Sequence, residues 1–371
     1  MIVAVILCLL VAWLLFSHSK SKFKRFASPG ICLPIVGHFY HFLFDDKIRS
    51  DPTNGIWDMY KRYQKDGLLY MKTLNIDTLW IGDFDTIKYL FSRQDVTGRL
   101  NSRQMKLALP ARRVEGSEMP GVLMSVGDIW HQQRRFTLKT LRDFGFGKQG
   151  KYIISNTLNY IMLFSGMEEM IKEEIVQFKQ LLNGVMADPV DFAHRLNLPI
   201  LNALWHVTVG ERFSYDNPKL ADIVERLTET FKIFASPNQA VLTSYPWLMY
   251  IPGASLFFQW ERAHKVLTEV SDMMEENIIK HKETIDVNAP RDFIDMMLIE
   301  IENTEDPTSS FFGQRGLDSL KVNLFDLFLA GSETTSTTLT WAVLYMVRYP
   351  EVQARLQQEL DSVVGINRFL S

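Results

Sequence analysis

The chain has 371 residues, of which 47% are hydrophobic and 22% are charged, and its formal net charge is −3. This is the composition of a globular protein long enough to build a large core. The near-neutral charge excludes the overall basic field of a nucleic-acid-binding protein. Cys8 and Cys32 are its two cysteines, which argues against a disulfide framework and favours a reducing compartment.

The N-terminus carries an unbroken apolar run over residues 2–16, followed by Lys20, Lys22, Lys24 and Arg25. A membrane-spanning helix needs about 17–25 residues, so this run is slightly short, and a cleaved signal peptide is the alternative. The basic cluster on the C-terminal side places the following domain in the cytosol. We expect an uncleaved membrane anchor over residues 1–17 and a basic, proline-rich connector over residues 18–37.

Apolar periodicity predicts a mainly α fold with a small N-terminal β-sheet, in one large domain over residues 38–371. Strand patterns cover residues 68–74 and 78–82, with a hairpin turn at 75–77. Helical patterns cover residues 168–185, 191–209, 218–234, 255–282, 291–302, 317–348 and 350–364. Pro199 is expected to kink or divide the second of these helices, because proline cannot donate an intrahelical hydrogen bond.

Two stretches differ from their surroundings, residues 152–167 and residues 366–371. The first has no charged residue, and the second ends the sequence without a helix cap. Two interpretations stay open. The stretches are an uncharged loop and a frayed tail, or they are translated non-coding sequence.

The strongest chemical signal is the apolar helix predicted over residues 324–346. Helical spacing gives it a stripe of polar and small residues: Asp326, Ala330, Glu333, Thr334 and Thr337. Gly331 costs about 1 kcal/mol against alanine and lets a flat group approach the backbone. An acid next to a hydroxyl suits proton delivery. A second membrane span and a core helix without chemistry are the alternatives.

Residues 330–335, Ala-Gly-Ser-Glu-Thr-Thr, resemble the oxygen-activation motif of the cytochrome P450 family. The resemblance implies that Glu333 is the acid of a proton relay and that Thr334 steadies dioxygen at the haem iron. It also implies that Ala330 and Gly331 lie over the face of the haem.

Three further stretches resemble the same family. Residues 130–134 are similar to its Trp-x-x-x-Arg helix, which implies that Trp130 and Arg134 bind a haem propionate; a surface Trp–Arg stack is the alternative. Residues 210–213 resemble a Gly-x-Arg-Phe turn, and residues 349–360 resemble the helix after the oxygen-activation helix. The overall pattern is that of the animal microsomal branch that metabolises drugs and xenobiotics.

The family needs a C-terminal cysteine in a Phe-x-x-Gly-x-x-x-Cys-x-Gly loop to hold the haem iron. Cys8 lies in the apolar run, and Cys32 is followed by Leu33-Pro34 rather than by the loop pattern. We therefore assign no metal-ligating residue, and we expect an incomplete cytochrome P450 fold, a fragment that is inactive as it stands.

For the family, the resemblance implies a haem-thiolate monooxygenase that inserts one oxygen atom from O2 into small apolar molecules. It implies NADPH–cytochrome P450 reductase as the electron donor, and an endoplasmic reticulum membrane location with the main domain in the cytosol. No nucleic-acid partner is expected. The alternative function is a non-catalytic, membrane-anchored binder of hydrophobic ligands.

Overall fold

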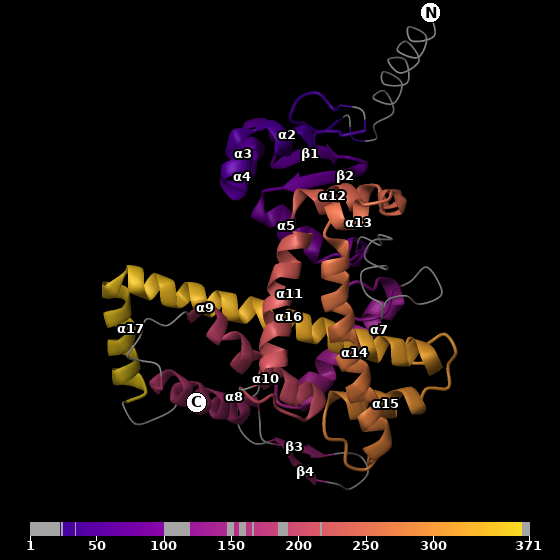
Figure 1. Ribbon diagram of the computed structural model, residues 1–371, viewed down its shortest axis with the longest axis vertical. Helices are drawn as coiled ribbons and strands as arrows, with labels where there is room; N and C mark the ends of the chain where they lie inside the picture. The colour runs from indigo at the N-terminus through magenta and orange to yellow at the C-terminus, as the bar shows by residue number, and fades with distance from the viewer. Residues whose placement is uncertain are drawn as a thin grey trace, which may run out of the picture. The chain divides into compact units, whose positions relative to one another are not determined.

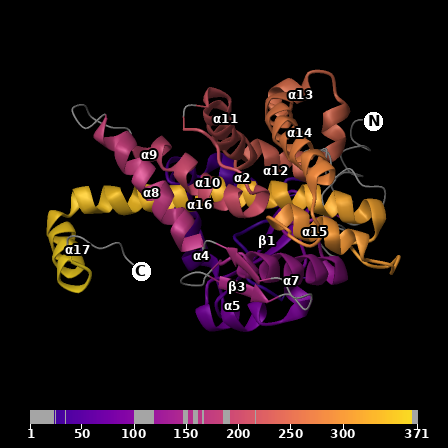
Figure 2. The same cartoon turned by 90° about the horizontal axis from the view of Figure 1, so that it is seen from below.

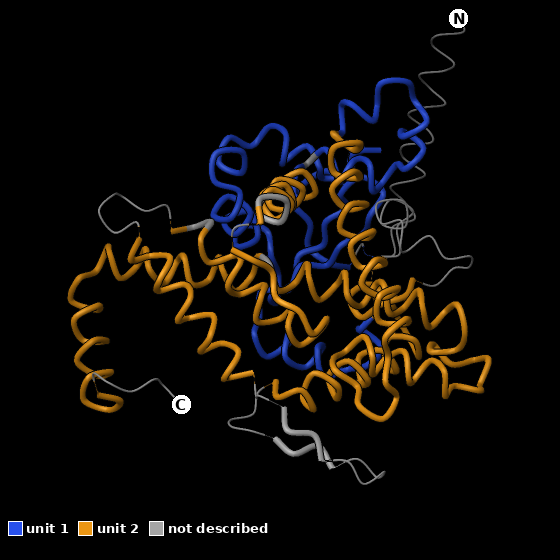
Figure 3. Tube along the Cα trace, turned by 60° about the horizontal axis from the view of Figure 1, so that its bottom comes forward, with its two compact units in different colours: residues 1–97, 235–258 blue, residues 98–234, 259–371 orange. Residues whose placement is uncertain are grey.

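The computed structural model of the chain describes residues 23, 25–33, 35–99, 119–146, 152–155, 161–164, 167–184, 192–215 and 217–365 (Figure 1). It divides into two compact units (Figure 3). Unit 1 comprises Met1–Thr97 and Ala235–Phe258, and unit 2 comprises Gly98–Phe234 and Gln259–Ser371.

Unit 1 contains an antiparallel hairpin and several short helices. Its elements are α2 (Tyr40–Phe44), α3 (Asp46–Ser50), α4 (Pro52–Tyr63), β1 (Leu68–Thr73), β2 (Ile76–Ile81), α5 (Phe84–Phe91), η1 (Gln94–Val96), α12 (Pro237–Ser244), η3 (Pro246–Tyr250) and α13 (Ala254–Phe257). The predicted hairpin is confirmed, and Leu69 pairs with Trp80 across it. The turn is shorter than predicted: it consists of Leu74, whose φ is 58°, and Asn75.

The core of unit 1 packs α3 and α4 against the hairpin. Its buried members are Ile48, Met59, Tyr60, Leu69 and Met71. Helices α3, α4 and α5 each begin where the side chain of an aspartate accepts a backbone N–H, at Asp45, Asp51 and Asp83.

The described residues of unit 2 form helices apart from one small hairpin. Its elements are α7 (Gly127–Asp143), β3 (Tyr152–Ser155), β4 (Ile161–Phe164), α8 (Met167–Asn183), α9 (Phe192–Arg195), α10 (Asn197–Val209), α11 (Pro218–Phe234), α14 (Trp260–Thr284), α15 (Phe293–Glu302), α16 (Gly313–Arg348) and α17 (Pro350–Val363). The predicted helices at 218–234, 317–348 and 350–364 are confirmed, with bounds that differ by a few residues at most.

The long helix α16 organises unit 2. Helices α10, α14 and α15 pack against it, and α10 is seen alongside it in Figure 2. The buried residues Phe325 and Phe328 face these neighbours, and the Phe328 ring lies edge-on to Trp205 of α10, 5.5 Å between centroids. A central helix with this burial provides the fixed frame for any site on it.

Two predicted helices are interrupted. The expected helix 255–282 is instead α13 and α14, because Gln259 adopts a left-handed conformation with a φ of 52°. The expected helix 191–209 is divided into α9 and α10 at Leu196. The break precedes Pro199, which sits in the first turn of α10, where its missing N–H removes no intrahelical bond.

Residues 152–167 are not simply a loop, because β3 and β4 pair antiparallel within them, with Ile153 opposite Leu163. The rest of this stretch before Met167 and the tail at 366–371 lie outside the described residues. Asp191, the expected cap of the helix that follows, lies outside them as well.

Among the helices of the described residues, α16 included, none combines the length and apolar character needed to cross a membrane. The apolar run at residues 2–16 lies outside that part of the chain.

Candidate functional site

Helix α7 brings Trp130 and Arg134 together. Their i, i+4 spacing places both side chains on one face, and the guanidinium carbon of Arg134 lies 5.3 Å from the centroid of the Trp130 ring. Trp130 is half-buried and Arg134 is exposed. The pair thus forms the Trp–Arg stack considered from the sequence, and its exposed guanidinium can still pair with a carboxylate.

The motif on α16 presents a small residue and a hydroxyl to solvent. Ala330 and Thr334 are both exposed. The Thr334 hydroxyl donates to the carbonyl oxygen of Ala330 at 2.9 Å, and the Thr338 hydroxyl donates to Thr334 in the same way at 2.8 Å. The bond to Ala330 fixes the direction of the Thr334 hydroxyl, whereas the bond from Thr338 is made to the Thr334 backbone carbonyl oxygen.

Gly331 serves packing between two helices. A Cβ atom at this position would overlap the Cδ2 atom of Leu204 in α10. The close approach that this glycine permits is therefore made by α10, and Ala330 is the small residue that remains exposed beside it. From residue types alone, a glycine for helix packing and a glycine for a flat ligand look the same.

Glu333 turns toward α11. Its Oε2 atom accepts a hydrogen bond from the Thr228 hydroxyl at 2.8 Å. Neighbouring residues on a helix project about 100° apart, so Glu333 and Thr334 face different partners despite being adjacent in sequence. Thr228 was not recognised from the sequence, because nothing local marks the residue that a helix meets across a packing interface.

Asp326 belongs to the stripe of polar and small residues predicted on this helix. It is buried, and it anchors a loop. Its carboxylate is 3% exposed and accepts the N–H groups of Val122 and Leu123 at 3.2 and 2.9 Å. Gly121, with a φ of 88°, lets that loop come close, since a Cβ there would lie 2.7 Å from Asp326 Oδ2. Helical spacing gives a common face for these polar residues but does not give their partners.

Helices α7 and α16 are joined at Asn323, whose side-chain amide donates to the Gln133 side chain at 2.7 Å. Asn323 precedes Thr334 by eleven residues, which is about 16 Å along a helix at 1.5 Å per residue. The Trp130–Arg134 pair and the Ala330–Thr334 motif therefore lie in one unit, on two helices that are fixed to each other.

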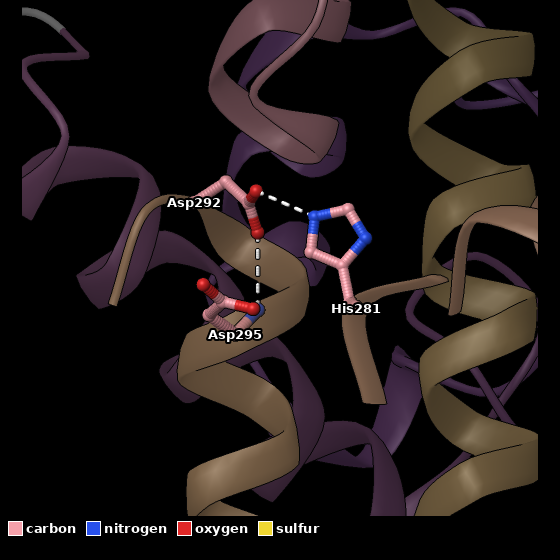
Figure 4. Close-up of side chains that lie close together, drawn as sticks. All are labelled: His281, Asp292 and Asp295. Atoms are coloured by element: carbon pink, nitrogen blue, oxygen red, sulfur yellow. Dashed lines mark hydrogen bonds and ion pairs between the residues drawn. The ribbon is translucent and has the colours of Figure 1, made fainter. Parts of the chain in front are cut away.

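A buried polar cluster joins α14 to α15 (Figure 4). His281 Nδ1 is 2.7 Å from the Asn277 carbonyl oxygen, and His281 Nε2 is 2.8 Å from Asp292 Oδ2. Burial lowers the pKa of His281, but the hydrogen bond and charge of Asp292 outweigh it and raise the pKa above its usual value.

The neighbouring carboxylate of Asp295 is also occupied. Arg291 donates to it through its backbone N–H at 3.0 Å and through its guanidinium at 2.6 and 2.9 Å. The Asp295 N–H in turn donates to Asp292 Oδ1 at 3.0 Å. Because the His281 nitrogens and these carboxylates already have protein partners, we interpret the cluster as a link between two helices rather than a metal centre.

A cavity of about 320 Å³ lies beside this cluster, lined by residues that include His206, Gly210, Glu211 and His281. Burial, together with the charge of Arg212, lowers the pKa of His206. Gly210 ends α10 with a φ of 72°, and a Cβ there would lie 2.8 Å from Asp292 Oδ2. Gly210 of the predicted Gly-x-Arg-Phe turn is thus required for two reasons: its backbone is left-handed, and Asp292 leaves no space for a side chain.

The same turn is fixed by Glu174 of α8, which is 4% exposed. Arg212 Nε donates to Glu174 Oε1 and the Tyr215 hydroxyl donates to Glu174 Oε2, each at 2.6 Å. Burial and these acidic contacts raise the pKa of Tyr215. Glu174 was missed in the sequence because it stands among other glutamates on the same helix.

The donors that a haem would need are present only in part. The exposed guanidinium of Arg134 fits a propionate, and the exposed Ala330 leaves room for a flat ring. A thiolate donor does not fit: the sequence has only Cys8 and Cys32. Cys32 lies in unit 1, and burial raises the pKa of its thiol, which disfavours the thiolate.

Comparisons with known proteins identify the family of the chain. The model of the family "Cytochrome P450" matches residues 28–371. The chain is 36% identical over 249 residues to cytochrome P450 2J2 of Homo sapiens, which covers 66% of this chain and 44% of that protein. It is 30% identical over 339 residues to cytochrome P450 2J3 of Rattus norvegicus, an alignment that covers 91% of this chain and 60% of that protein. It is 29% identical over 358 residues to cytochrome P450 2J5 of Mus musculus, and this alignment covers 95% of this chain and 63% of that protein.

The chain therefore belongs to the cytochrome P450 family, whose prosthetic group is haem. It spans between 44% and 63% of the length of these three relatives.

Proposed function

We propose that this chain is part of a haem-thiolate monooxygenase that inserts one oxygen atom of O2 into small apolar organic molecules. The observation that carries the proposal is the pairing of an exposed Ala330 and Thr334 on α16 with an acid, Glu333, one residue before the threonine. When bound, haem supplies the oxygen chemistry. The protein supplies binding, orientation and protons.

Each residue has a role in this proposal. Trp130 and Arg134 bind a propionate and orient the ring, and Ala330 leaves its face open. Thr334 holds a proton on its hydroxyl, at present donated to the Ala330 carbonyl oxygen. Glu333 accepts a hydrogen bond from the Thr228 hydroxyl and is the acid that takes up and releases a proton. For the Thr334 hydroxyl to give its proton to Glu333, the hydrogen bond to the Ala330 carbonyl oxygen must break, because that bond uses the only proton of the hydroxyl. The bond from Thr228 can remain, because it uses one of the two carboxylate oxygens of Glu333.

Haem-thiolate chemistry requires a cysteine donor, and we propose that the 371-residue chain alone does not turn over substrate. Reduction and exposure to carbon monoxide test this. A haem-loaded sample of the chain should lack the absorbance band of thiolate-ligated haem. A strong thiolate band from this chain would contradict the proposal and would require Cys8 or Cys32 to act as the ligand.

The alternative function, a non-catalytic binder of hydrophobic ligands, makes a different prediction. Such a protein would bind an apolar ligand equally well with and without haem. The monooxygenase proposal instead requires haem to alter that affinity, since the ring would form one wall of the substrate site. Measuring the affinity in both states separates the two functions.

The electron donor is proposed to be NADPH–cytochrome P450 reductase. Three exposed cationic side chains on α7, beside the Arg134 assigned to the propionate, support a docking surface for an acidic flavoprotein: Arg135, Lys139 and Arg142. Charge reversal at Lys139 should weaken reductase binding at low salt more than at high salt. Reversal of the exposed Lys280 on α14 is the matched control and should have a smaller effect.

We also propose that the protein is attached to the endoplasmic reticulum membrane with its main domain in the cytosol. The apolar run at residues 2–16 and exposed apolar side chains in unit 1 support this. Ile35 and Phe257 are 62% and 65% exposed. The Tyr245 hydroxyl bonds to the Ile35 carbonyl oxygen at 2.7 Å, which brings the segment after α12 to the connector. A chain lacking residues 2–16 should float less with phospholipid vesicles.

A further inference from the structure

Helices α7 and α16 are joined by three polar side chains that are fully enclosed: Gln133, Ser310 and Asn323, each 0% exposed. Gln133 Nε2 donates to the hydroxyl oxygen of Ser310 at 2.8 Å and to its carbonyl oxygen at 3.3 Å. Asn323 Nδ2 donates to Gln133 Oε1 at 2.7 Å. All three residues belong to unit 2.

The direction of each amide follows from its partners. Both contacts of Gln133 Nε2 are to oxygens of Ser310, so its own oxygen faces Asn323, which must then present its NH2 group. The Ser310 N–H is bound separately by Gln132 Oε1 at 2.8 Å. The loop before α16 is thus held by two consecutive glutamines of α7.

Polar side chains buried in this way are directional. Apolar residues of similar volume would fill the same space, but they would not restrict α7 to a single rotation about its own axis. A buried amide is stable only where its partners meet it, and loses free energy when the helix turns away from them. The Asn323 Oδ1 atom has no hydrogen-bond partner within the described part of the chain. Its Nδ2 group also donates weakly to the Met297 sulfur at 3.6 Å, so the bond to Gln133 is the stronger contact that offsets burial of the amide.

Fixing Gln133 also fixes its neighbours on α7. At 100° per residue, Gln133 lies about 60° around the helix from Trp130 and about 100° from Arg134. Because Gln133 points toward α16, the side chains of Trp130 and Arg134 must point away from that contact, both to the same side of it. The rotation of α7 therefore decides where the guanidinium of Arg134 points.

We propose that Gln133, held by Asn323 and Ser310, is the positioning residue that aims Trp130 and Arg134 at a carboxylate on the edge of the bound porphyrin. This inference rests on the proposed function, because it assumes that the pair binds a propionate. Gln133 acts through α7 and touches neither the ring nor the substrate.

The test compares haemin with haemin dimethyl ester, whose propionates carry no charge, in binding titrations of the full chain. The chain should prefer haemin by about ten-fold or more, the effect of one charge-assisted hydrogen bond. Gln133→Leu should reduce this preference to about two-fold or less while leaving the affinity for the ester unchanged within about two-fold. A residue that only stabilised the fold would lower both affinities together.

Two further variants separate positioning from stability. The double variant Gln133→Leu/Asn323→Leu removes both amides and leaves an apolar pair between the helices, so it should fold even if the single variant does not, and it should still lose the preference. Gln239→Leu is the matched control: it removes a buried glutamine in unit 1 that donates to the Phe258 carbonyl oxygen at 2.9 Å. This control should keep the preference.

The outcomes are distinguishable. If the parent chain binds haemin and the ester equally, the proposed role of Trp130 and Arg134 is wrong, and this inference is wrong with it. If the parent chain prefers haemin and the folded double variant keeps the full preference, only the role of Gln133 is overturned. A preference lost in the double variant and kept in Gln239→Leu supports it.

Discussion

The two halves of α16 differ in burial although both are rich in apolar residues. In the first half, Leu320, Leu324, Phe325 and Phe328 are each at most 1% exposed. In the second half, Trp341, Leu344, Tyr345 and Val347 are 52–71% exposed. Helices α10, α14 and α15 pack against α16, and Asn323 in its first half bonds to Gln133 of α7. The second half leads to α17, which is itself largely exposed. The comparison shows that helical periodicity defines the helix, while neighbouring elements decide which part of it becomes core.

The largest expected change in stability comes from comparing one aromatic residue in each half of α16. Phe325→Ala should destabilise unit 2 by about 3–5 kcal/mol, because it removes a fully buried ring and leaves a cavity. Tyr345→Ala, at a residue 58% exposed, should change stability by about 0.5 kcal/mol or less. Urea unfolding followed by circular dichroism measures both. Equal losses would show that the second half is also packed in solution.

The next effect tests the buried acid of the first half. Asp326→Ala should cost about 2–3 kcal/mol, because the N–H groups of Val122 and Leu123 lose a charged acceptor. Asp318→Ala is the control: this residue lies on the same helix and accepts a hydrogen bond from exposed Gln314 at 2.9 Å. Its loss should be close to zero in the same unfolding experiment. A small loss at Asp326 would mean that the loop is not anchored there.

A smaller effect depends on pH. The folded-state pKa of His281 is raised, so its contribution to stability is present below the unfolded pKa of about 6.5 and is lost as pH rises through the folded value. The groups around it are Asp292, Asp295, Arg291, His206 and Glu211. As pH rises above about 6.5, the Tm of the chain should therefore fall by a few degrees more than that of His281→Gln.

That pH comparison has its own control. His131→Gln removes an exposed histidine on α7 and should leave the pH profile of the Tm unchanged. If His281→Gln and the parent chain gave parallel profiles, the charged His281–Asp292 pair would not contribute to the stability of the buried region.

The smallest effect lies at Gly331, between the two halves. Gly331→Ala gains about 1 kcal/mol of helix propensity but forces Leu204 aside, and overpacking costs about 1–3 kcal/mol, so a net loss of about 1 kcal/mol is expected. Leu204→Ala makes room for the new methyl group. In the double variant the losses should be less than additive. Additive losses in the unfolding free energies would show that the two residues do not pack together.

Sequence patterns were sufficient for elements that are defined locally. The hairpin of β1 and β2, the bounds of α11 and the length of α16 follow from apolar spacing and from prolines at helix starts. The break at Gln259 was not predictable, because a non-glycine residue in the left-handed region reflects the surrounding packing. The pairing of β3 with β4 was missed because an uncharged stretch carries no clear period.

The candidate site was likewise predictable only where it is defined by local sequence. The motif placed Glu333 and Thr334 on one helix, but their hydrogen-bond partners, Thr228 and the Ala330 carbonyl oxygen, depend on rotamers and on α11. The motif leaves Gln133 as an unspecified position between Trp130 and Arg134. Its hydrogen bonds to Asn323 and Ser310, on which its proposed role rests, depend on residues far away in the sequence.

Gly121 links the loop before α7 to α16 in a way that restricts how the sequence can diverge. Its backbone is left-handed, and the space that a side chain would need is taken by Val322 and Asp326. A larger residue at 121 is compatible with this geometry only if residues 322 and 326 shrink and the loop finds another acceptor. Position 121 is about two hundred residues from positions 322 and 326 in the chain, yet substitutions at the three positions should occur together among family members.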